Sequence, residues 1–182
     1  MTLPRWHEEP IQKSHRRQEF DCGDEDMNQF IRRFARQGHE RHIAKTFCAI
    51  DNSDPGRVLG FYTLTTASMG IKDIPPDLTK GLARHDVGGY KLARIATDLR
   101  VAGQGLGGQL LSAAALRCLR ASHEVGGHLL YIDAKSGRAA QWYVNFGAAP
   151  LANHPLTLVI KLEDFVDGLR AKGLLGRIGG DQ

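Results

Sequence analysis

The most informative stretch of the sequence is a glycine-rich one: Ala102-Gly103-Gln104-Gly105-Leu106-Gly107-Gly108. Residues 90–98 before it favour a strand, and residues 106–122 after it repeat apolar side chains at helical spacing. Because glycines lack a Cβ atom, the backbone of this turn is able to approach an oxygen-rich ligand and direct several N–H groups at it. The helix that follows adds the positive end of its dipole. The stretch therefore predicts an anion site between a strand and a helix.

Two common nucleotide motifs do not fit this turn. A P-loop requires Gly-Lys-Ser/Thr at its end, and none is present. A dinucleotide-binding Rossmann turn requires a strand–acidic residue pair and an earlier βαβ unit that fit around it, and this sequence does not provide that combination. The remaining interpretations are an anion site of another type, or a glycine-rich helix start without a ligand.

The rest of the chain predicts one α/β domain over residues 1–182, with a mixed central sheet and helices on both faces. The first helix is predicted to carry one apolar stripe, formed by Met27, Phe30, Ile31, Phe34 and Ala35. Asp24 is its predicted N-cap. Residues 70–89 read as a long connection, and the glycine-rich tail, residues 173–182, is expected to fray. The expected elements, in order, are a helix over 24–38, hairpin strands over 46–51 and 58–66, a strand over 90–98, a helix over 106–122, a strand over 128–134, a helix over 138–146 and a strand over 156–162.

Composition narrows the class of protein further. The chain has 182 residues, 42% of them hydrophobic and 24% charged, with a net charge of +4, which permits a polyanionic partner such as RNA without requiring one. Cys22, Cys48 and Cys118 are too few and too widely spaced for a disulfide framework, and no His or Cys spacing indicates a metal. No apolar run resembles a signal peptide or a membrane span, so we expect a cytoplasmic protein.

The glycine turn resembles the signature of the GNAT acetyltransferase superfamily, Gln/Arg-x-x-Gly-x-Gly/Ala between the fourth strand and the third helix. Ala102 departs from that pattern, which removes one side-chain contact near the phosphates. A narrower set of matches resembles the GNAT toxins of type II toxin–antitoxin modules and spans roughly residues 10–165. It includes Phe20-Asp21-Cys22-Gly23, Met27-Asn28-Gln29-Phe30-Ile31, Leu92-Ala93-Arg94-Ile95-Ala96-Thr97-Asp98, Asp133-Ala134-Lys135 and Trp142-Tyr143-Val144-Asn145-Phe146-Gly147.

This resemblance implies the GNAT acyl-CoA N-acyltransferase fold, acetyl-CoA as cofactor and acetylation of the α-amino group of aminoacyl-tRNA, which blocks translation. It also implies a ribbon–helix–helix antitoxin, through which the complex binds DNA, and a homodimer. The cofactor-binding residues that it implies are Ile95, Ala96, Thr97, Ala102, Gly103, Gln104, Gly105, Leu106, Gly107, Gly108, Asp133 and Phe146, and the general acid is Tyr143. From the sequence alone, Tyr143 is equally well explained as a packing residue.

The acceptor amine needs little activation. An α-amino group has a pKa of about 7.7–8.0, and a neighbouring ester lowers it, so no carboxylate base is required. A phenol with a pKa of about 10 stays protonated at neutral pH and is able to protonate a departing thiolate. Six basic residues are candidates for tRNA phosphates, although they also fit a solvated face: Arg32, Arg33, Arg36, Arg41, Lys45 and Arg94.

Two other functions remain open at this point. The first is a metabolic GNAT enzyme that acetylates a small amine, an antibiotic or a protein N-terminus. It would share the cofactor site but would not need the basic helix. The second is a catalytically inactive GNAT module that senses acyl-CoA or represses transcription with a partner. Charged tRNA as acceptor distinguishes the toxin from both.

Overall fold

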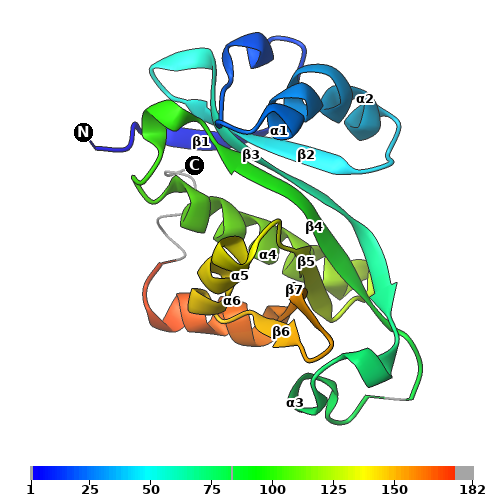
Figure 1. Ribbon diagram of the computed structural model, residues 1–182. Coiled ribbons are helices and arrows are strands. Elements are labelled where there is room, and N and C mark those ends of the chain that lie inside the picture. The colour runs from blue at the N-terminus through cyan, green and yellow to red at the C-terminus, as the bar shows by residue number, and fades with distance from the viewer. Residues whose placement is uncertain (1, 83, 175–182) are drawn as a thin grey trace. The chain divides into compact units, whose positions relative to one another are not determined.

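The computed structural model describes residues 2–82 and 84–174. Within them the strands form a seven-stranded sheet in the order β1-β2-β3-β4-β5-β7-β6 (Figure 1). The strands are β1 (Trp6–Pro10), β2 (Lys45–Asp51), β3 (Asp54–Met69), β4 (Val87–Thr97), β5 (Leu129–Asp133), β6 (Ala149–Leu151) and β7 (His154–Lys161). The α-helices are α1 (Glu25–Gln29), α2 (Ala35–Glu40), α3 (Pro76–Thr79), α4 (Leu106–Val125), α5 (Gly137–Asn145) and α6 (Leu162–Ala171).

The sheet is mixed, as predicted. β4 and β5 pair in parallel, whereas β1 and β2, β2 and β3, β5 and β7, and β6 and β7 pair antiparallel. The chain forms two compact units, one from residues 2–65, 93–114 and 173–174 and the other from residues 66–82, 84–92 and 115–172. The single domain over residues 1–182 stays a prediction. Most of the tail, residues 173–182, lies outside the described residues.

In the first unit, helices cover both faces of the sheet. On one face α1 and α2 lie along β2 and β3 (Figure 1), and Phe20, Ile31 and Phe61 form a fully buried core. On the other face α4 packs so closely on Gly60 of β3 that a Cβ atom there would lie 2.8 Å from Leu110 Cδ1. The glycine therefore lets the helix that follows the predicted anion turn sit directly on the strand.

The first helix contains a π turn that periodicity does not predict. Residues Phe30–Phe34 (η2) form this turn between α1 and α2, and the Ala35 N–H donates to Phe30 O, five residues back. The extra residue keeps Met27 and Ala35 buried but turns Phe34 outward, where it is 59% exposed. The single stripe predicted for this helix is thus wrong at Phe34. Asp24 is the N-cap, as predicted, and accepts from the Met27 N–H.

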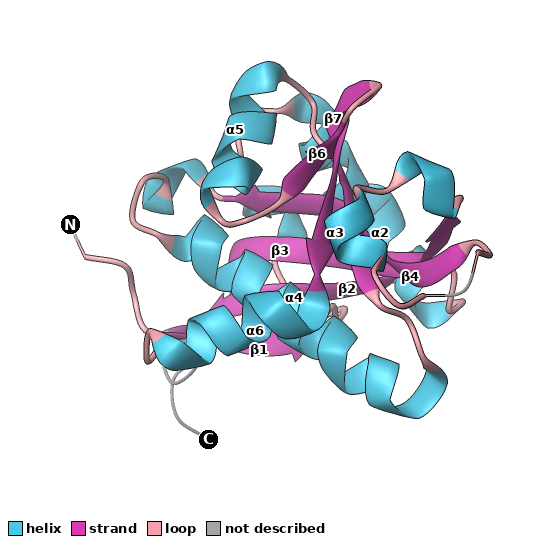
Figure 2. Cartoon of the chain, turned by 90° about the horizontal axis from the view of Figure 1, so that it is seen from below, coloured by secondary structure: helices cyan, strands magenta, loops and turns pink. Residues whose placement is uncertain are grey.

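In the second unit, β5 lies between β4 and β7, and Leu129 and Val159 form its core with Val87. Helix α5 packs against β6 and β7 (Figure 2). The sequence reading missed β1, β6 and α6. β1 contains two glutamates and a proline, and β6 has three residues. Helix α6, by contrast, carries a clear signal, because Leu162, Val166 and Leu169 are buried at helical spacing.

Helix α4 has the buried face that its sequence predicts, formed by Leu106, Leu110, Leu111, Ala114 and Cys118. The three cysteines are free thiols, and burial raises the pKa of Cys118 to about 12. Across the described part of the chain, no helix is long and apolar enough to cross a membrane. The same residues contain no group of three His, Cys, Asp or Glu side chains able to hold a metal ion.

Candidate active site

The end of β4 leads directly into the glycine turn. Ile95, Ala96 and Thr97 are half-buried at the end of the strand, and buried Asp98 follows them. The Asp98 carboxylate caps a 3₁₀ turn, Leu99–Val101 (η4), by accepting from the Arg100 N–H at 2.9 Å. It also accepts from the Asp21 N–H at 3.2 Å. These bonds tie the strand end to the loop that precedes α1, so that the glycine turn begins from a fixed point.

The glycine turn has the backbone geometry of an anion site. Gly103 and Gly105 have φ of +74° and +87°, which disfavours other residues, and a Cβ atom on either would meet no atom within 4 Å. Helix α4 begins at Leu106, and its first bond of the α-helical type runs from Gln109 N to Gly105 O at 3.4 Å. The N–H groups of Leu106, Gly107 and Gly108 therefore have no acceptor within the helix. They are available to a phosphate.

Side chains around the turn add little to this backbone site. Ala102 is exposed and offers no polar group. The Gln104 amide donates to Arg100 O at 3.3 Å, and its Oε1 is buried without a hydrogen-bond partner among the described residues. Arg100 is held by Asp98 and by Glu19 O, so it does not replace the missing arginine or glutamine at position 102. A bound anion must therefore rely mainly on backbone N–H groups.

Tyr143 lies in the second unit on α5. Ser136 caps this helix by accepting from the Ala139 N–H at 3.2 Å. Tyr143 is 8% exposed, and its ring meets that of Trp142 edge to face with 4.9 Å between centroids. Within the described residues, no hydrogen bond engages its hydroxyl. Burial raises the pKa of Tyr143 to about 12, so the phenol stays protonated throughout the physiological range.

Asp133 and Phe146 lie in the same unit as Tyr143. Phe146 is half-buried at the end of α5, with its ring centroid 4.7 Å from that of Trp142. The Asp133 carboxylate ends β5 and accepts from Lys91 Nζ at 2.6 Å and from Thr157 Oγ1 at 3.2 Å. The hydrogen bond from Lys91 lowers the pKa of Asp133. Sequence reasoning missed Lys91, because the ion pair joins neighbouring strands that are far apart in the chain.

The predicted cofactor residues thus fall into two groups. Residues 95–108 lie together in the first unit, whereas Asp133, Tyr143 and Phe146 lie together in the second. Each group has the local geometry that its proposed role requires: open N–H groups in the first, and a protonated phenol in the second. That the two groups act on one cofactor stays a prediction.

The predicted basic residues separate into structural and exposed ones. Arg32 donates to Phe20 O at 2.7 Å and lies 3.9 Å from Glu25, while Arg36 pairs with Glu40. Arg94 stacks over the Phe30 ring, 4.3 Å from its centroid. The other three, Arg33, Arg41 and Lys45, are exposed or half-buried, and no carboxylate among the described residues pairs with them.

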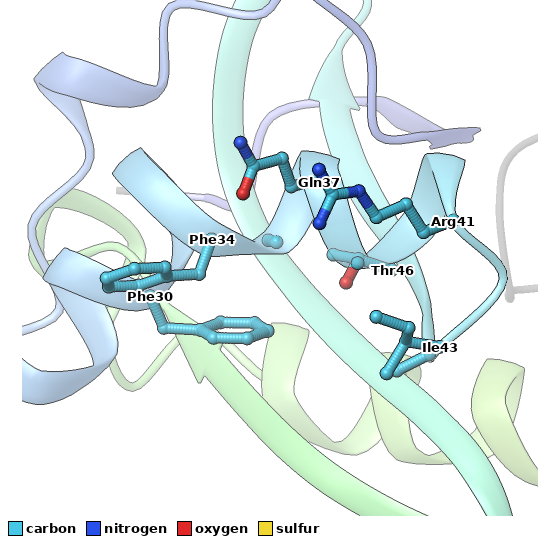
Figure 3. Close-up of a pocket in the computed structure, with 9 residues that line it drawn as sticks. Phe30, Phe34, Gln37, Arg41, Ile43 and Thr46 are labelled. Atoms are coloured by element: carbon cyan, nitrogen blue, oxygen red, sulfur yellow. The ribbon is translucent and has the colours of Figure 1, made fainter.

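A pocket of about 270 Å³ opens beside the exposed arginines in the first unit. Figure 3 shows the rings of Phe30 and Phe34 at one end and Ile43 at the other, with the guanidinium of Arg41 between them in this view. The pocket is lined by Phe30, Phe34, Ala35, Gln37, Gly38, Arg41, Ile43, Ala44 and Thr46. The sequence predicts a role for Arg41 but not for Phe34 in this pocket, because regular helical spacing places Phe34 in the core.

Known proteins are similar to this chain in both sequence and fold. No protein-family model matches the chain. The tRNA-acetylating toxin of Mycobacterium tuberculosis is 28% identical over 157 residues, covering 86% of this chain and 89% of that protein. The structure of AtaT complexed with acetyl-methionyl-tRNAfMet has a TM-score of 0.83 and 25% identity, covering 91% of this chain and 99% of that chain. A second structure contains a mutant of the toxin AtaT bound to the C-terminus of the antitoxin AtaR and to acetyl-CoA. It has a TM-score of 0.75 and 25% identity, covering 88% of this chain and 95% of that chain.

These similarities agree with the strand order, the mixed sheet and the glycine turn. The curated relative and the structures align along nearly the whole chain, and not at the glycine turn alone. The chain therefore has the GNAT acyltransferase fold, and along nearly all of its length it is similar to the GNAT toxins of toxin–antitoxin modules.

Proposed function

We propose that this chain is an acetyl-CoA-dependent N-acetyltransferase toxin that acetylates the α-amino group of aminoacyl-tRNA and thereby blocks translation. The observation that carries this proposal is the likeness to AtaT, whose structure holds acetyl-methionyl-tRNAfMet. The name of the Mycobacterium tuberculosis relative, a tRNA-acetylating toxin, supports the same substrate class. We propose action in the cytoplasm, where aminoacyl-tRNA is used.

The glycine turn fits the pyrophosphate of acetyl-CoA. Its left-handed glycines leave open space where side chains would stand, and the N–H groups of Leu106, Gly107 and Gly108 have no helical acceptor. Ala102, Gly103, Gln104 and Gly105 complete the turn. The bound cofactor supplies the acetyl group as a thioester. AtaT, at 25% identity, has been solved with acetyl-CoA, which supports the same cofactor here.

The end of β4 orients the acetyl group in this proposal. A backbone N–H within Ile95, Ala96 and Thr97 donates to the acetyl oxygen as negative charge develops on it. Such a donor is fixed in place before the reaction, because Asp98 anchors the strand end immediately after these residues. Phe146 packs against the apolar arm of the cofactor, and Asp133 contacts the cofactor while holding Lys91.

Tyr143 is the general acid of the proposed reaction. Its phenol is protonated at neutral pH, because burial raises its pKa to about 12. It donates that proton to the departing sulfur, whose conjugate acid has a pKa of about 8.5. The acceptor α-amine, with a pKa of about 7.7–8.0, is substantially neutral without a protein base. Its proton leaves to water, and water returns a proton to the Tyr143 phenolate.

The basic side of the first unit is the proposed tRNA surface. Arg33 and Arg41 supply charges that no described carboxylate pairs with, and Lys45, at the start of β2, donates to His39 O at 3.1 Å. Arg32, Arg36 and Arg94 stabilise the helical segment that contains Arg33. Basic residues of this kind bind phosphates without reading sequence. A steep loss of tRNA affinity with added salt is therefore expected.

We also propose an antitoxin partner of the ribbon–helix–helix type, through which the complex binds DNA, and a homodimeric toxin. The AtaT complex with the C-terminus of AtaR supports the antitoxin. Purification of the chain with the product of its neighbouring gene tests this partner, and light scattering tests the dimer.

Labelled acetyl transfer to charged total tRNA tests the proposed activity. The chain is incubated with radiolabelled acetyl-CoA and either charged tRNA, the same tRNA after deacylation, or free amino acids. We expect label only in charged tRNA. Label in free amines but not in charged tRNA would assign the chain to the metabolic GNAT enzymes, and binding of acetyl-CoA without any transfer would assign it to the inactive modules.

A further inference from the structure

The π turn places Phe34 on the surface, where Phe34 and Ile43 form an exposed apolar wall. Phe34 is 59% exposed and Ile43 is 67% exposed, and both line the pocket of about 270 Å³ shown in Figure 3. In a regular helix Phe34 would be buried with the apolar stripe, whereas the π turn places it at the pocket. Turns of this kind are frequent at functional sites. The wall is therefore a candidate surface for binding a ligand, and the reaction proposed at the glycine turn does not use it.

The charge around the pocket is concentrated. Residues 30–46 contain five Lys or Arg residues and one acid, Glu40, so this segment has a net charge of +4. The whole chain also has a net charge of +4, so the remaining residues are balanced. Arg41 lines the pocket itself, and Lys45 lies next to the lining residue Thr46. Arg41 thus lies at the apolar wall, within a segment that carries a net charge of +4.

The size and chemistry of the pocket favour one flat, anionic ligand. Pockets for drug-sized molecules have volumes of about 300–1,000 Å³, so this one suits a smaller group such as a single nucleobase. Sites for single-stranded nucleic acid combine exposed aromatic rings, on which bases stack, with cations that follow the backbone. Gln37, which also lines the pocket, carries an amide that can both donate to and accept from a base edge. An apolar peptide side chain would use the wall but not the charges.

We propose that this pocket binds an unpaired nucleotide of the tRNA, with its base against Phe34 and Ile43 and its phosphate on Arg41. This assignment rests on the proposed tRNA substrate and adds to it a site for a base. A single-stranded end or loop fits, whereas a paired base does not, because its faces are covered by stacking. The pocket therefore distinguishes single-stranded from double-stranded RNA.

Binding to labelled RNA tests the proposal without depending on catalysis. Fluorescence anisotropy is measured for uncharged tRNA, a short single-stranded RNA and the same strand in a duplex, over a series of salt concentrations. Phe34→Ala should weaken tRNA and single-strand binding about 5- to 100-fold and leave duplex binding unchanged. Arg41→Ala should weaken binding and reduce the slope of log affinity against log salt by about 1.

Two variants provide matched controls. Val125 is 79% exposed at the end of α4, and Arg120 is an exposed arginine on the same helix. Val125→Ala and Arg120→Ala should bind RNA as the unmodified chain does. Because Phe34 is exposed, its replacement should leave the melting temperature nearly unchanged, which separates lost binding from lost folding.

The outcomes separate this proposal from the proposed function. Acetylation of charged tRNA with unchanged RNA binding by Phe34→Ala and Arg41→Ala would overturn the nucleotide pocket and leave the enzyme activity intact. Weakened single-strand binding by both variants, in a chain that transfers no acetyl group, would support the pocket and reject the activity. If Phe34→Ala released the antitoxin but kept RNA affinity, the pocket would belong to the antitoxin, and our proposal would be wrong.

Discussion

The guanidinium of Arg100 donates two hydrogen bonds to the buried carboxylate of Asp98, from Nε to Oδ1 at 2.7 Å and from Nη2 to Oδ2 at 2.9 Å. The pair lies between the end of β4 and the glycine turn. Arg100 is the arginine nearest the turn, and this pairing occupies its side chain. The Asp98 carboxylate also accepts from the Asp21 N–H and so anchors the loop that contains Asp21. The relationship connects the stability of the first unit to the position of the proposed phosphate site.

Replacing Asp98 should therefore reduce both stability and cofactor binding. Asp98→Ala removes the charged acceptor of the Asp21 and Arg100 N–H groups, and a hydrogen bond to a charged group contributes about 1.5–3 kcal/mol. Chemical denaturation and acetyl-CoA titration measure the two effects. Asp167→Ala removes an exposed partner of Arg170 and should change stability by less than about 0.5 kcal/mol. Equal effects of the two variants would contradict the anchoring role.

The Asp98 carboxylate should also make the free energy of unfolding depend on pH in the acid range. Burial alone would raise the pKa of Asp98, but the hydrogen bonds from Arg100 and from the backbone of Arg100 and Asp21 outweigh it, so the pKa is lowered. A lowered folded pKa stabilises the protein fully above the unfolded value, about 3.9, and this stabilisation is lost as the pH falls through the folded pKa. Unfolding free energy measured from pH 6 to pH 3 should fall less steeply in Asp98→Ala.

A methyl group at Gly105 should disturb the turn without steric contact. The φ of +87° costs an L-residue about 1–2 kcal/mol, so Gly105→Ala should destabilise the protein and weaken acetyl-CoA binding. Gly168 lies inside α6 with no atom within 4 Å of an added Cβ. Gly168→Ala should instead stabilise the protein by about 0.5–1 kcal/mol. Thermal unfolding of the pair checks the opposite signs.

Restoring the family's side chain at position 102 should strengthen cofactor binding. Ala102 is exposed with φ −59° and ψ 142°, a conformation that any residue adopts. An exposed ion pair is worth about 0.2–1 kcal/mol, so Ala102→Arg should lower the Kd for acetyl-CoA by up to about fivefold. Ala102→Glu should raise it through repulsion. Identical Kd values for the two variants would place the phosphates elsewhere.

Removing the phenol of Tyr143 should slow turnover without weakening cofactor binding. Tyr143→Phe removes the proposed acid, so kcat should fall about 100-fold or more. The variant keeps the ring contact with Trp142, so the Kd for acetyl-CoA should stay constant. Tyr90 is equally buried, but its hydroxyl donates to Gly126 O at 2.6 Å, so Tyr90→Phe is the matched control and should retain kcat. Full activity of Tyr143→Phe would remove this residue from the mechanism.

The parts of the fold that depend on neighbours in the sequence were predictable. Gly103 and Gly105 define their turn by local backbone freedom, and Asp24 caps its helix three residues from its partner. The missed features depend on distant contacts. The Lys91–Asp133 pair forms only when β4 and β5 align, and the Asp21–Asp98 bond spans 77 positions. Phe34 was misplaced because regular helical spacing contains no π turn.

Identification of the acetylated product determines whether the chain acetylates aminoacyl-tRNA. After reaction of the chain with acetyl-CoA and charged total tRNA, mild alkali releases the amino acids from the RNA, and mass spectrometry identifies them. We expect N-acetylated amino acids in the fraction released from tRNA, in amounts that fall about 100-fold with Tyr143→Phe. Unmodified amino acids in that fraction, from a chain that binds acetyl-CoA, would show that aminoacyl-tRNA is not its substrate.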